Sequence, residues 1–180
     1  MKRWIVTALG KDQPGIVAGV TKILYRLGCN LEDSAMTRLE GEFTVMLIFS
    51  TRTATSEAAL RKAFGPLEQK LRLAVHLKPL TMKESHAPRS RGRQFLISVY
   101  GADQPGIVYR MSEALAKAGV NITDVHTHRS TGRGPSLYLL LLEVELPSRM
   151  TSTTLEQRLK MLGKSLGVQV SLRASDPNVL

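Results

Sequence analysis

The chain has 180 residues, of which 43% are hydrophobic and 22% charged, and its formal net charge is +10. These proportions are ordinary for a soluble globular protein, and the length fits one medium domain or two small ones. The single cysteine, Cys29, excludes a disulfide within the chain, and no apolar run is long enough for a signal peptide or a membrane span. We therefore expect a cytoplasmic protein with no membrane contact.

The first elements in chain order are a strand and a helix. RWIVTAL, from Arg3, alternates apolar and polar residues and is rich in β-branched ones, which predicts a strand. Pro14 fits the first turn of the helix that follows, because proline lacks only an N–H that would be unpaired there. Gly28 is placed to end this helix. Its apolar stripe consists of Ile16, Val20, Ile23, Leu24 and Leu27.

A hairpin, a second helix and a last strand follow. Strands are expected near 30–38 and 43–51, with Glu40-Gly41 as their turn. LAVHLKP predicts the last strand, and Pro66 should kink or restart the helix before it. The helix is indicated by apolar residues spaced four, three and four apart: Leu60, Phe64, Leu67 and Leu71.

The same order then repeats. GKDQPGIV at Gly10–Val17 returns as GADQPGIV at Gly101–Val108, and the second apolar quartet is Leu155, Leu159, Leu162 and Leu166. In the second copy, strands are expected near 121–129 and 136–146, with a longer turn at 131–135. We expect an α+β protein of two tandem ferredoxin-like βαββαβ domains, each a four-stranded antiparallel sheet with two helices on one face. The predicted bounds are 1–80 and 94–175, joined by a basic linker at 81–93.

The repeated loop has the chemistry of an amino-acid site. A helix start offers unpaired N–H groups to a carboxylate, and a glycine there lets a ligand come close to the backbone. An aspartate in the loop could cap the helix or meet a ligand ammonium group, and an asparagine after the helix offers a donor and an acceptor. In the two copies these residues are Gly15 and Gly106, Asp12 and Asp103, and Asn30 and Asn121.

GKDQPGIV…GCNLED and GADQPGIV…GVNITD resemble tandem ACT domains, in particular two-ACT regulatory proteins of the glycine cleavage system transcriptional repressor type. The resemblance covers nearly the whole chain. It implies sensing of a small amino acid where two ACT units pack side by side, within the chain or across a homodimer. It also implies action on a regulatory protein partner. The ligand-binding residues that it implies are Gly10, Asp12, Pro14, Gly15, Ile16, Asn30, Gly101, Asp103, Pro105, Gly106, Ile107 and Asn121.

Nothing in the sequence indicates an enzyme or a cofactor. It contains no P-loop, dinucleotide fingerprint or nucleophile elbow. His126 and His128 could share one face of a strand, but no third metal ligand is evident, so we expect no metal site. Cys29 is expected to fill core space as a small hydrophobe.

Three alternatives to an amino-acid sensor stay open. The protein could be an interaction module with degenerate sites, a detached regulatory subunit of an amino-acid enzyme, or a nucleic-acid-associated regulator acting through the basic linker. The linker, TMKESHAPRSRGR, has four basic residues against one acidic residue, but it also has the composition of a plain interdomain connection. Few aromatic residues and no nucleic-acid motif weigh against direct binding of nucleic acid.

The linker alternative has a direct test. If residues 81–93 only connect two domains, replacing Arg89, Arg91 and Arg93 with serine should leave folding and amino-acid binding unchanged. A nucleic-acid arm would instead give DNA binding at low salt that weakens steeply as salt rises. Absent or salt-insensitive DNA binding in a titration of the unsubstituted protein would remove the nucleic-acid alternative.

Overall fold

A computed structural model describes residues 2–51, 55–81, 92–130 and 136–175. The chain divides into two compact units, Met1–Ala87 and Pro88–Leu180, called here the first unit and the second unit. The point of division falls inside the predicted linker, whose last residue, Arg93, begins a strand of the second unit and donates to the carbonyl of Met150. Most of the linker and the predicted turn at 131–135 lie outside the described residues.

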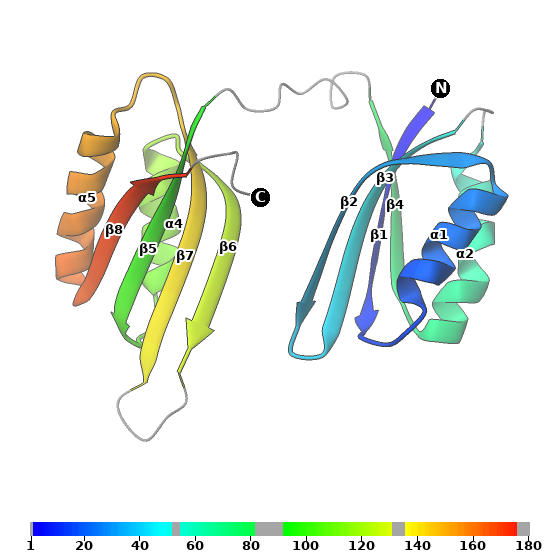
Figure 1. Ribbon diagram of the computed structural model, residues 1–180, viewed down its shortest axis with the longest axis horizontal. Helices are drawn as coiled ribbons and strands as arrows, with labels where there is room; N and C mark the ends of the chain where they lie inside the picture. Colours follow the sequence, from blue (N-terminus) through cyan, green and yellow to red (C-terminus); the bar gives the residue numbers. More distant parts are fainter. Residues whose placement is uncertain (1, 52–54, 82–91, 131–135, 176–180) are drawn as a thin grey trace. The chain divides into compact units, whose positions relative to one another are not determined.

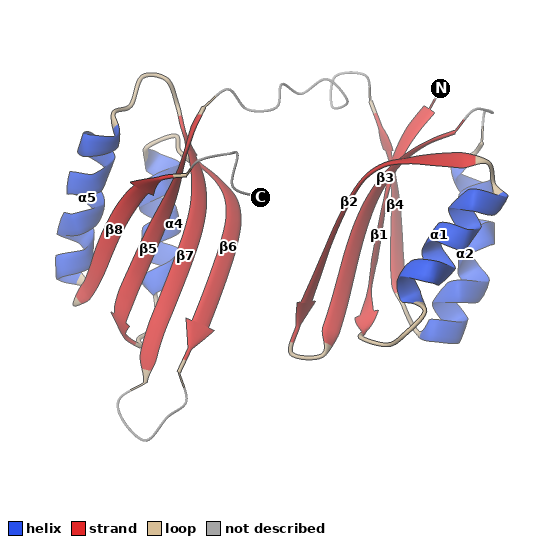
Figure 2. Ribbon diagram, in the orientation of Figure 1, coloured by secondary structure: helices blue, strands red, loops and turns tan. Residues whose placement is uncertain are grey.

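The first unit is a four-stranded antiparallel sheet in the order β2-β3-β1-β4, with both helices on one face (Figures 1 and 2). Its elements follow the predicted βαββαβ order: β1 (Lys2–Lys11), α1 (Ile16–Arg26), β2 (Cys29–Leu39), β3 (Glu42–Thr51), α2 (Glu57–Leu71) and β4 (Ala74–Leu80).

The second unit has the same order and topology, with its sheet arranged β6-β7-β5-β8 (Figure 1). Its elements are β5 (Arg93–Ala102), α4 (Ile107–Lys117), β6 (Asn121–Arg129), β7 (Leu137–Leu146), α5 (Ser152–Ser165) and β8 (Val168–Ala174). The predicted fold class is therefore confirmed in both halves of the chain.

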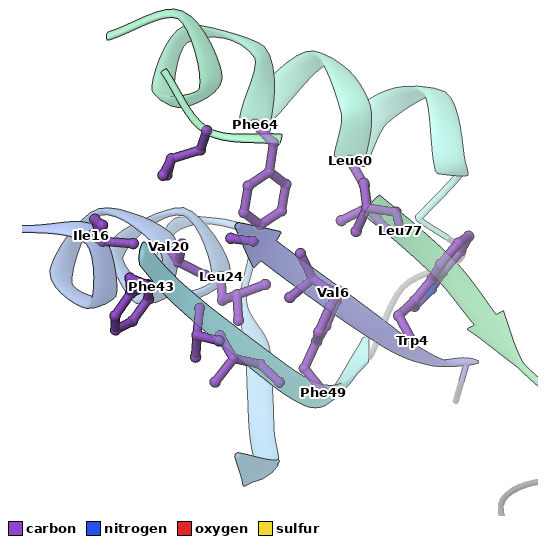
Figure 3. Packing of buried hydrophobic residues seen from close by; sticks show 14 residues of the cluster. Trp4, Val6, Ile16, Val20, Leu24, Phe43, Phe49, Leu60, Phe64 and Leu77 are labelled. Carbon is purple, nitrogen blue, oxygen red and sulfur yellow. The ribbon is translucent and has the colours of Figure 1, made fainter. Parts of the chain in front are cut away.

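Each core lies between the helices and the inner face of its own sheet. Alternate residues of the inner strand β1 point inward, and Figure 3 shows Trp4 and Val6 among the buried side chains of the first core, with Trp4 near Leu77. The predicted stripes supply three of the four helical faces in the cores. Their buried members are Ile16, Val20, Leu24, Leu60 and Phe64 in the first unit, and Leu155 and Leu159 in the second. In α4 the buried residues are Ile107, Met111 and Leu115.

Residues in the left-handed backbone conformation follow the first helix of each unit and form the turn between β2 and β3. Gly28 and Gly119 follow α1 and α4 with φ of 66° and 68°. After α4, the N–H of Gly119 donates to the carbonyl of Ala116 and that of Val120 to Leu115, which is a Schellman motif. Glu40 and Gly41 both have positive φ and join β2 to β3, as the sequence predicts.

Pro66 does not restart α2. The helix is continuous from Glu57 to Leu71, with the proline exposed inside it. The ring leaves one carbonyl of the preceding turn without its helical donor, which normally disfavours the helix by about 3 kcal/mol. Burial of Leu60 and Phe64 against the sheet holds the helix in place across this position.

The helices of each unit start in two different ways. α2 and α5 have conventional side-chain caps, because Ser56 and Thr151 accept from the backbone N–H groups three residues later, each at 3.2 Å. α1 and α4 begin after the left-handed glycines Gly15 and Gly106, and neither has a side-chain cap. The predicted capping role of Asp12 and Asp103 is therefore wrong. Pro14 and Pro105 lie in the turn before the helix rather than in its first turn.

This difference predicts unequal costs for two alanine substitutions. Ser56→Ala should lower the free energy of unfolding by about 1 kcal/mol, because an N–H group of α2 loses its acceptor. Asp12→Ala should cost only a few tenths of a kcal/mol, the usual contribution of an exposed ion pair. Urea unfolding of both variants measures the two costs, and a larger loss for Asp12→Ala would show that the aspartate caps α1 in solution.

Two glycines predict unequal changes in stability. A Cβ on Gly101 would lie 2.8 Å from Cγ1 of Val168 and 3.1 Å from its Cα, so Gly101→Ala should destabilise the second unit by about 1–3 kcal/mol. A Cβ on Gly65, inside α2, would meet no side chain or distant backbone within 4 Å beyond its chain neighbours. Gly65→Ala should therefore change the stability of the first unit by less than about 1 kcal/mol, because the gain in helix propensity is opposed by the contact of the new Cβ with the ring of Pro66. Calorimetric melting should show the larger loss for Gly101→Ala, and equal shifts would contradict the packing described here.

Candidate ligand-binding loops

The DQPG loops, residues 12–15 and 103–106, connect the central strand of each sheet to the first helix. Each loop is tied at two points. The Asp12 N–H donates to the carbonyl of Gly41 at 2.8 Å, and the Gln13 side-chain amide donates to the carbonyl of Leu71 at 3.0 Å. In the second unit Asp103 and Gln104 make the equivalent bonds, to Ser136 and Leu166.

The glutamine contact is a feature that the sequence analysis missed. Gln13 and Gln104 reach the last turn of the other helix in their units, where carbonyl groups lack helical donors. Each glutamine therefore joins the start of one helix to the end of the second and fixes the loop between them. The signal was present, because the glutamine is identical in both copies of the repeat.

The backbone conformation of each DQPG loop requires a glycine at its last position. Gly15 has φ 98° and ψ −5°, and Gly106 has φ 95° and ψ −5°, a conformation that residues with a Cβ rarely adopt. Apart from the adjoining residues, a Cβ at either position would meet no atom of the described chain within 4 Å, so the space beside the loop is open. The first turns of α1 and α4 carry no acidic residue. Each helix therefore presents uncapped N–H groups and the positive end of its dipole to open space.

An ion pair flanks each helix start. Asp12 Oδ2 lies 3.3 Å from Nη1 of Arg38, and Asp103 Oδ2 lies 3.7 Å from Nη1 of Arg129. The arginines are mostly exposed, at 70% and 62%, and the aspartates are about one-third exposed, at 32% and 28%. Each loop thus has its own carboxylate, and a guanidinium from β2 or β6, beside uncapped backbone N–H groups. The sequence repeat aligns the two arginines, but they were not among the predicted ligand-binding residues.

The other predicted residues near the loops have structural roles. A Cβ on Gly10 would lie 2.8 Å from Cδ2 of Leu73, so this glycine allows close packing against the residues that lead from α2 into β4, as Gly101 does against β8. The side chains of Ile16 and Ile107 are buried in the cores. Only their backbone N–H groups are therefore available to a ligand.

The asparagines do not join the loops of their own units. Asn30 and Asn121 stand at the opposite ends of α1 and α4 from the loop glycines, and an eleven-residue helix is about 16 Å long. Asn121 instead lines a hollow of about 290 Å³ with Gly92 and the buried Glu145. From the sequence we expect an asparagine of one unit to complete the site of a neighbouring unit. Because this depends on how the units are placed, it stays a prediction.

The described histidines and cysteine offer no metal or thiol site. Among the described residues, no group of three or more His, Cys, Asp or Glu side chains is placed to hold a metal ion. Of the two histidines on β6, His126 already has a partner, because its Nε2 lies 2.9 Å from Oδ2 of Asp124. Cys29 packs against the first core, and burial raises the pKa of its thiol, which disfavours the reactive thiolate.

The comparisons with known proteins match this arrangement. A family model described as the ACT domain matches the chain twice, at residues 2–78 and 93–173. The glycine cleavage system transcriptional repressor of Escherichia coli K12 is 27% identical over 172 residues, covering 93% of this chain and 87% of the relative. A protein of Streptococcus mutans with the family designation UPF0237 is 37% identical over 73 residues, covering 41% of this chain and 83% of that protein.

Solved structures share the fold over almost the whole chain. A crystal structure described as that of an unknown protein from Galdieria sulphuraria superposes with a TM-score of 0.80 at 24% identity, covering 97% of this chain and 99% of that one. In the described residues no helix combines the length and the apolar character needed to cross a membrane. The two matches of the family model take in both units, and the chain belongs to the ACT-domain family, with two ACT domains in tandem and kinship to the glycine cleavage system transcriptional repressor.

Proposed function

We propose that this protein is a non-enzymatic regulator that binds a small amino acid at its DQPG loops and so modulates a regulatory protein partner. The observation that carries the proposal is the uncapped start of α1 and α4 beside an exposed aspartate–arginine pair, present in both units. The relationship to the glycine cleavage system transcriptional repressor supports a role in amino-acid metabolism or its transcriptional control.

The chemistry of each loop fits both ends of an α-amino acid. The carboxylate would accept from the N–H groups at Gly15-Ile16 and from the guanidinium of Arg38, while Asp12 would accept from the ammonium group. The existing ion pair is exposed, and such pairs contribute about 0–1 kcal/mol, so a ligand can rearrange it at low cost. Gly106-Ile107, Arg129 and Asp103 would do the same in the second unit.

A second candidate function is a ligand-free interaction module. It is favoured by the packing roles of Gly10 and Gly101 and by the distance of the asparagines from the loops of their own units. These residues are explained by the fold without a ligand, whereas the uncapped helix starts and the repeated ion pairs are not.

A thermal-shift screen of the twenty common amino acids tests the proposal first. A ligand present at 100 times its dissociation constant should stabilise the protein by about 2.7 kcal/mol. Calorimetric titration of that ligand should then show binding weakened about tenfold or more in Asp12→Ala or Asp103→Ala, because a charged contact contributes about 1.5–3 kcal/mol. Arg38→Ala and Arg129→Ala should weaken binding similarly.

The controls remove carboxylates of other exposed ion pairs. Glu57 and Glu156 pair with Arg61 and Lys160 on the helices, so Glu57→Ala and Glu156→Ala change charge to the same extent away from the loops. Both should leave affinity unchanged. Unchanged affinity in the Asp12→Ala, Asp103→Ala double variant would exclude the loops as the site, and a screen without any ligand would favour the interaction module.

A further inference from the structure

A groove runs between α1 and α2 on the helical side of the first unit, where Figure 1 shows the two helices side by side. Its volume is about 610 Å³, and we call it the α1–α2 groove. Two small residues widen the groove, Ala18 on α1 and Ala63 on α2, because their short side chains fill little of the space between the helices. At Gly19 the helices meet closely, since a Cβ there would lie 2.6 Å from Cδ1 of Leu67.

The groove has an apolar floor and a basic rim. Ile23, Leu67 and Leu71 are only partly buried against the core beneath it and line the groove with their remaining surface. The rim consists of Lys22 and Arg26, one turn apart on α1, and of Lys70 on α2. None of the described residues that line the groove is acidic.

The three rim cations differ from other cations on the helices. Arg61, Lys117 and Lys160 each pair with a glutamate one turn earlier in the same helix. Lys22, Arg26 and Lys70 are exposed and form no ion pair with any described acidic residue. Their charge is therefore available to an outside partner.

The second unit provides an internal comparison. In the repeat alignment, Tyr109 and Arg110 replace Ala18 and Gly19, and Glu113 replaces Lys22. Tyr109 donates to Glu113, and Glu113 also pairs with Lys117, so these side chains satisfy one another. Small residues and unpaired cations at these positions thus distinguish the first unit, although both units share one fold.

We propose that the α1–α2 groove binds an acidic, amphipathic helical segment of a partner protein. A third helix can lay its apolar side chains between two packed helices, and carboxylates one turn apart on that helix would match the spacing of Lys22 and Arg26. The groove is concave, which suits an inserted helix better than the flat surface of a membrane. The proposal rests on the partner part of the proposed function and not on amino-acid binding.

The groove also touches the candidate ligand site. Pro14 and Gly15 of the first DQPG loop line one end of it. A ligand at the Gly15-Ile16 N–H groups would therefore lie beside the docked segment. This contact gives the protein a short path by which an amino acid could alter the binding of a partner.

The test uses the full chain and a designed peptide. The probe is a fluorescent peptide of about 16 residues, roughly 24 Å as a helix, with leucines on one face and glutamates beside them. Fluorescence anisotropy should show saturable binding that weakens as salt rises. Lys22→Glu, which copies Glu113 of the second unit, should raise Kd about tenfold or more. The matched control Lys62→Glu, an exposed position of α2 outside the groove, should change Kd less than about twofold.

Two further probes separate the groove from general attraction. Ala18→Tyr, which copies Tyr109, should weaken peptide binding without a change of charge. A peptide of the same composition but without an apolar face should not bind. Circular dichroism and melting temperature check that each variant is folded.

The following results would overturn the proposal: no binding of the acidic peptide, equal loss in Lys22→Glu and Lys62→Glu, or equal binding of the peptide without an apolar face. Binding to phosphatidylglycerol vesicles in the absence of peptide binding would assign the basic rim to a membrane instead. Peptide binding at the groove in a protein that binds no amino acid would support this inference while contradicting the sensing part of the proposed function.

Discussion

The constraint on which the rest of the structure depends is the left-handed glycine between the central strand and the first helix. The chain must leave the middle of the sheet and immediately cover its inner face, and Gly15 and Gly106 make that turn with φ near 95–98°. The helix then begins with its apolar stripe already facing the sheet. Because glycine has no side chain to cap the helix, the same turn leaves N–H groups open to an anion. Fold and candidate chemistry therefore follow from one backbone conformation.

The two units share this turn but differ in the surfaces around it. Both keep the glutamine that ties the loop to the second helix and the aspartate–arginine pair beside the helix start. On the outer helical surface, the first unit has small residues and unpaired cations where the second has Tyr109, Arg110 and Glu113. This division suits a protein in which both units bind the same kind of ligand and one unit contacts a partner.

Much of the fold could be predicted from the sequence because it depends on local periodicity. The apolar stripes, the Glu40-Gly41 turn and the glycine after α1 are signals carried by neighbouring residues, and the repeat shows the last-helix quartet and this glycine twice. The errors concern choices that tertiary contacts decide. Asp12 is a residue type that often caps a helix, but its backbone N–H donates to Gly41 and its side chain pairs with Arg38. The helix α2 does not restart at Pro66, because the burial of its apolar face against the sheet holds it in place. The repeat marks Gln13 as a residue kept in both copies, but its contact with the end of α2 and the α1–α2 groove depend on two helices that are distant in sequence, and no local pattern shows them.

The central claim is that the uncapped helix starts bind the carboxylate of an amino acid, and amide chemical shifts test it most directly. In a two-dimensional ¹⁵N–¹H NMR titration with the amino acid that stabilises the protein most, the amides of Gly15, Ile16, Gly106 and Ile107 should shift most and should saturate with the calorimetric Kd. The Nε–H signals of Arg38 and Arg129 should shift with them. Saturable shifts confined to other parts of the chain, with these four amides unmoved, would contradict the account.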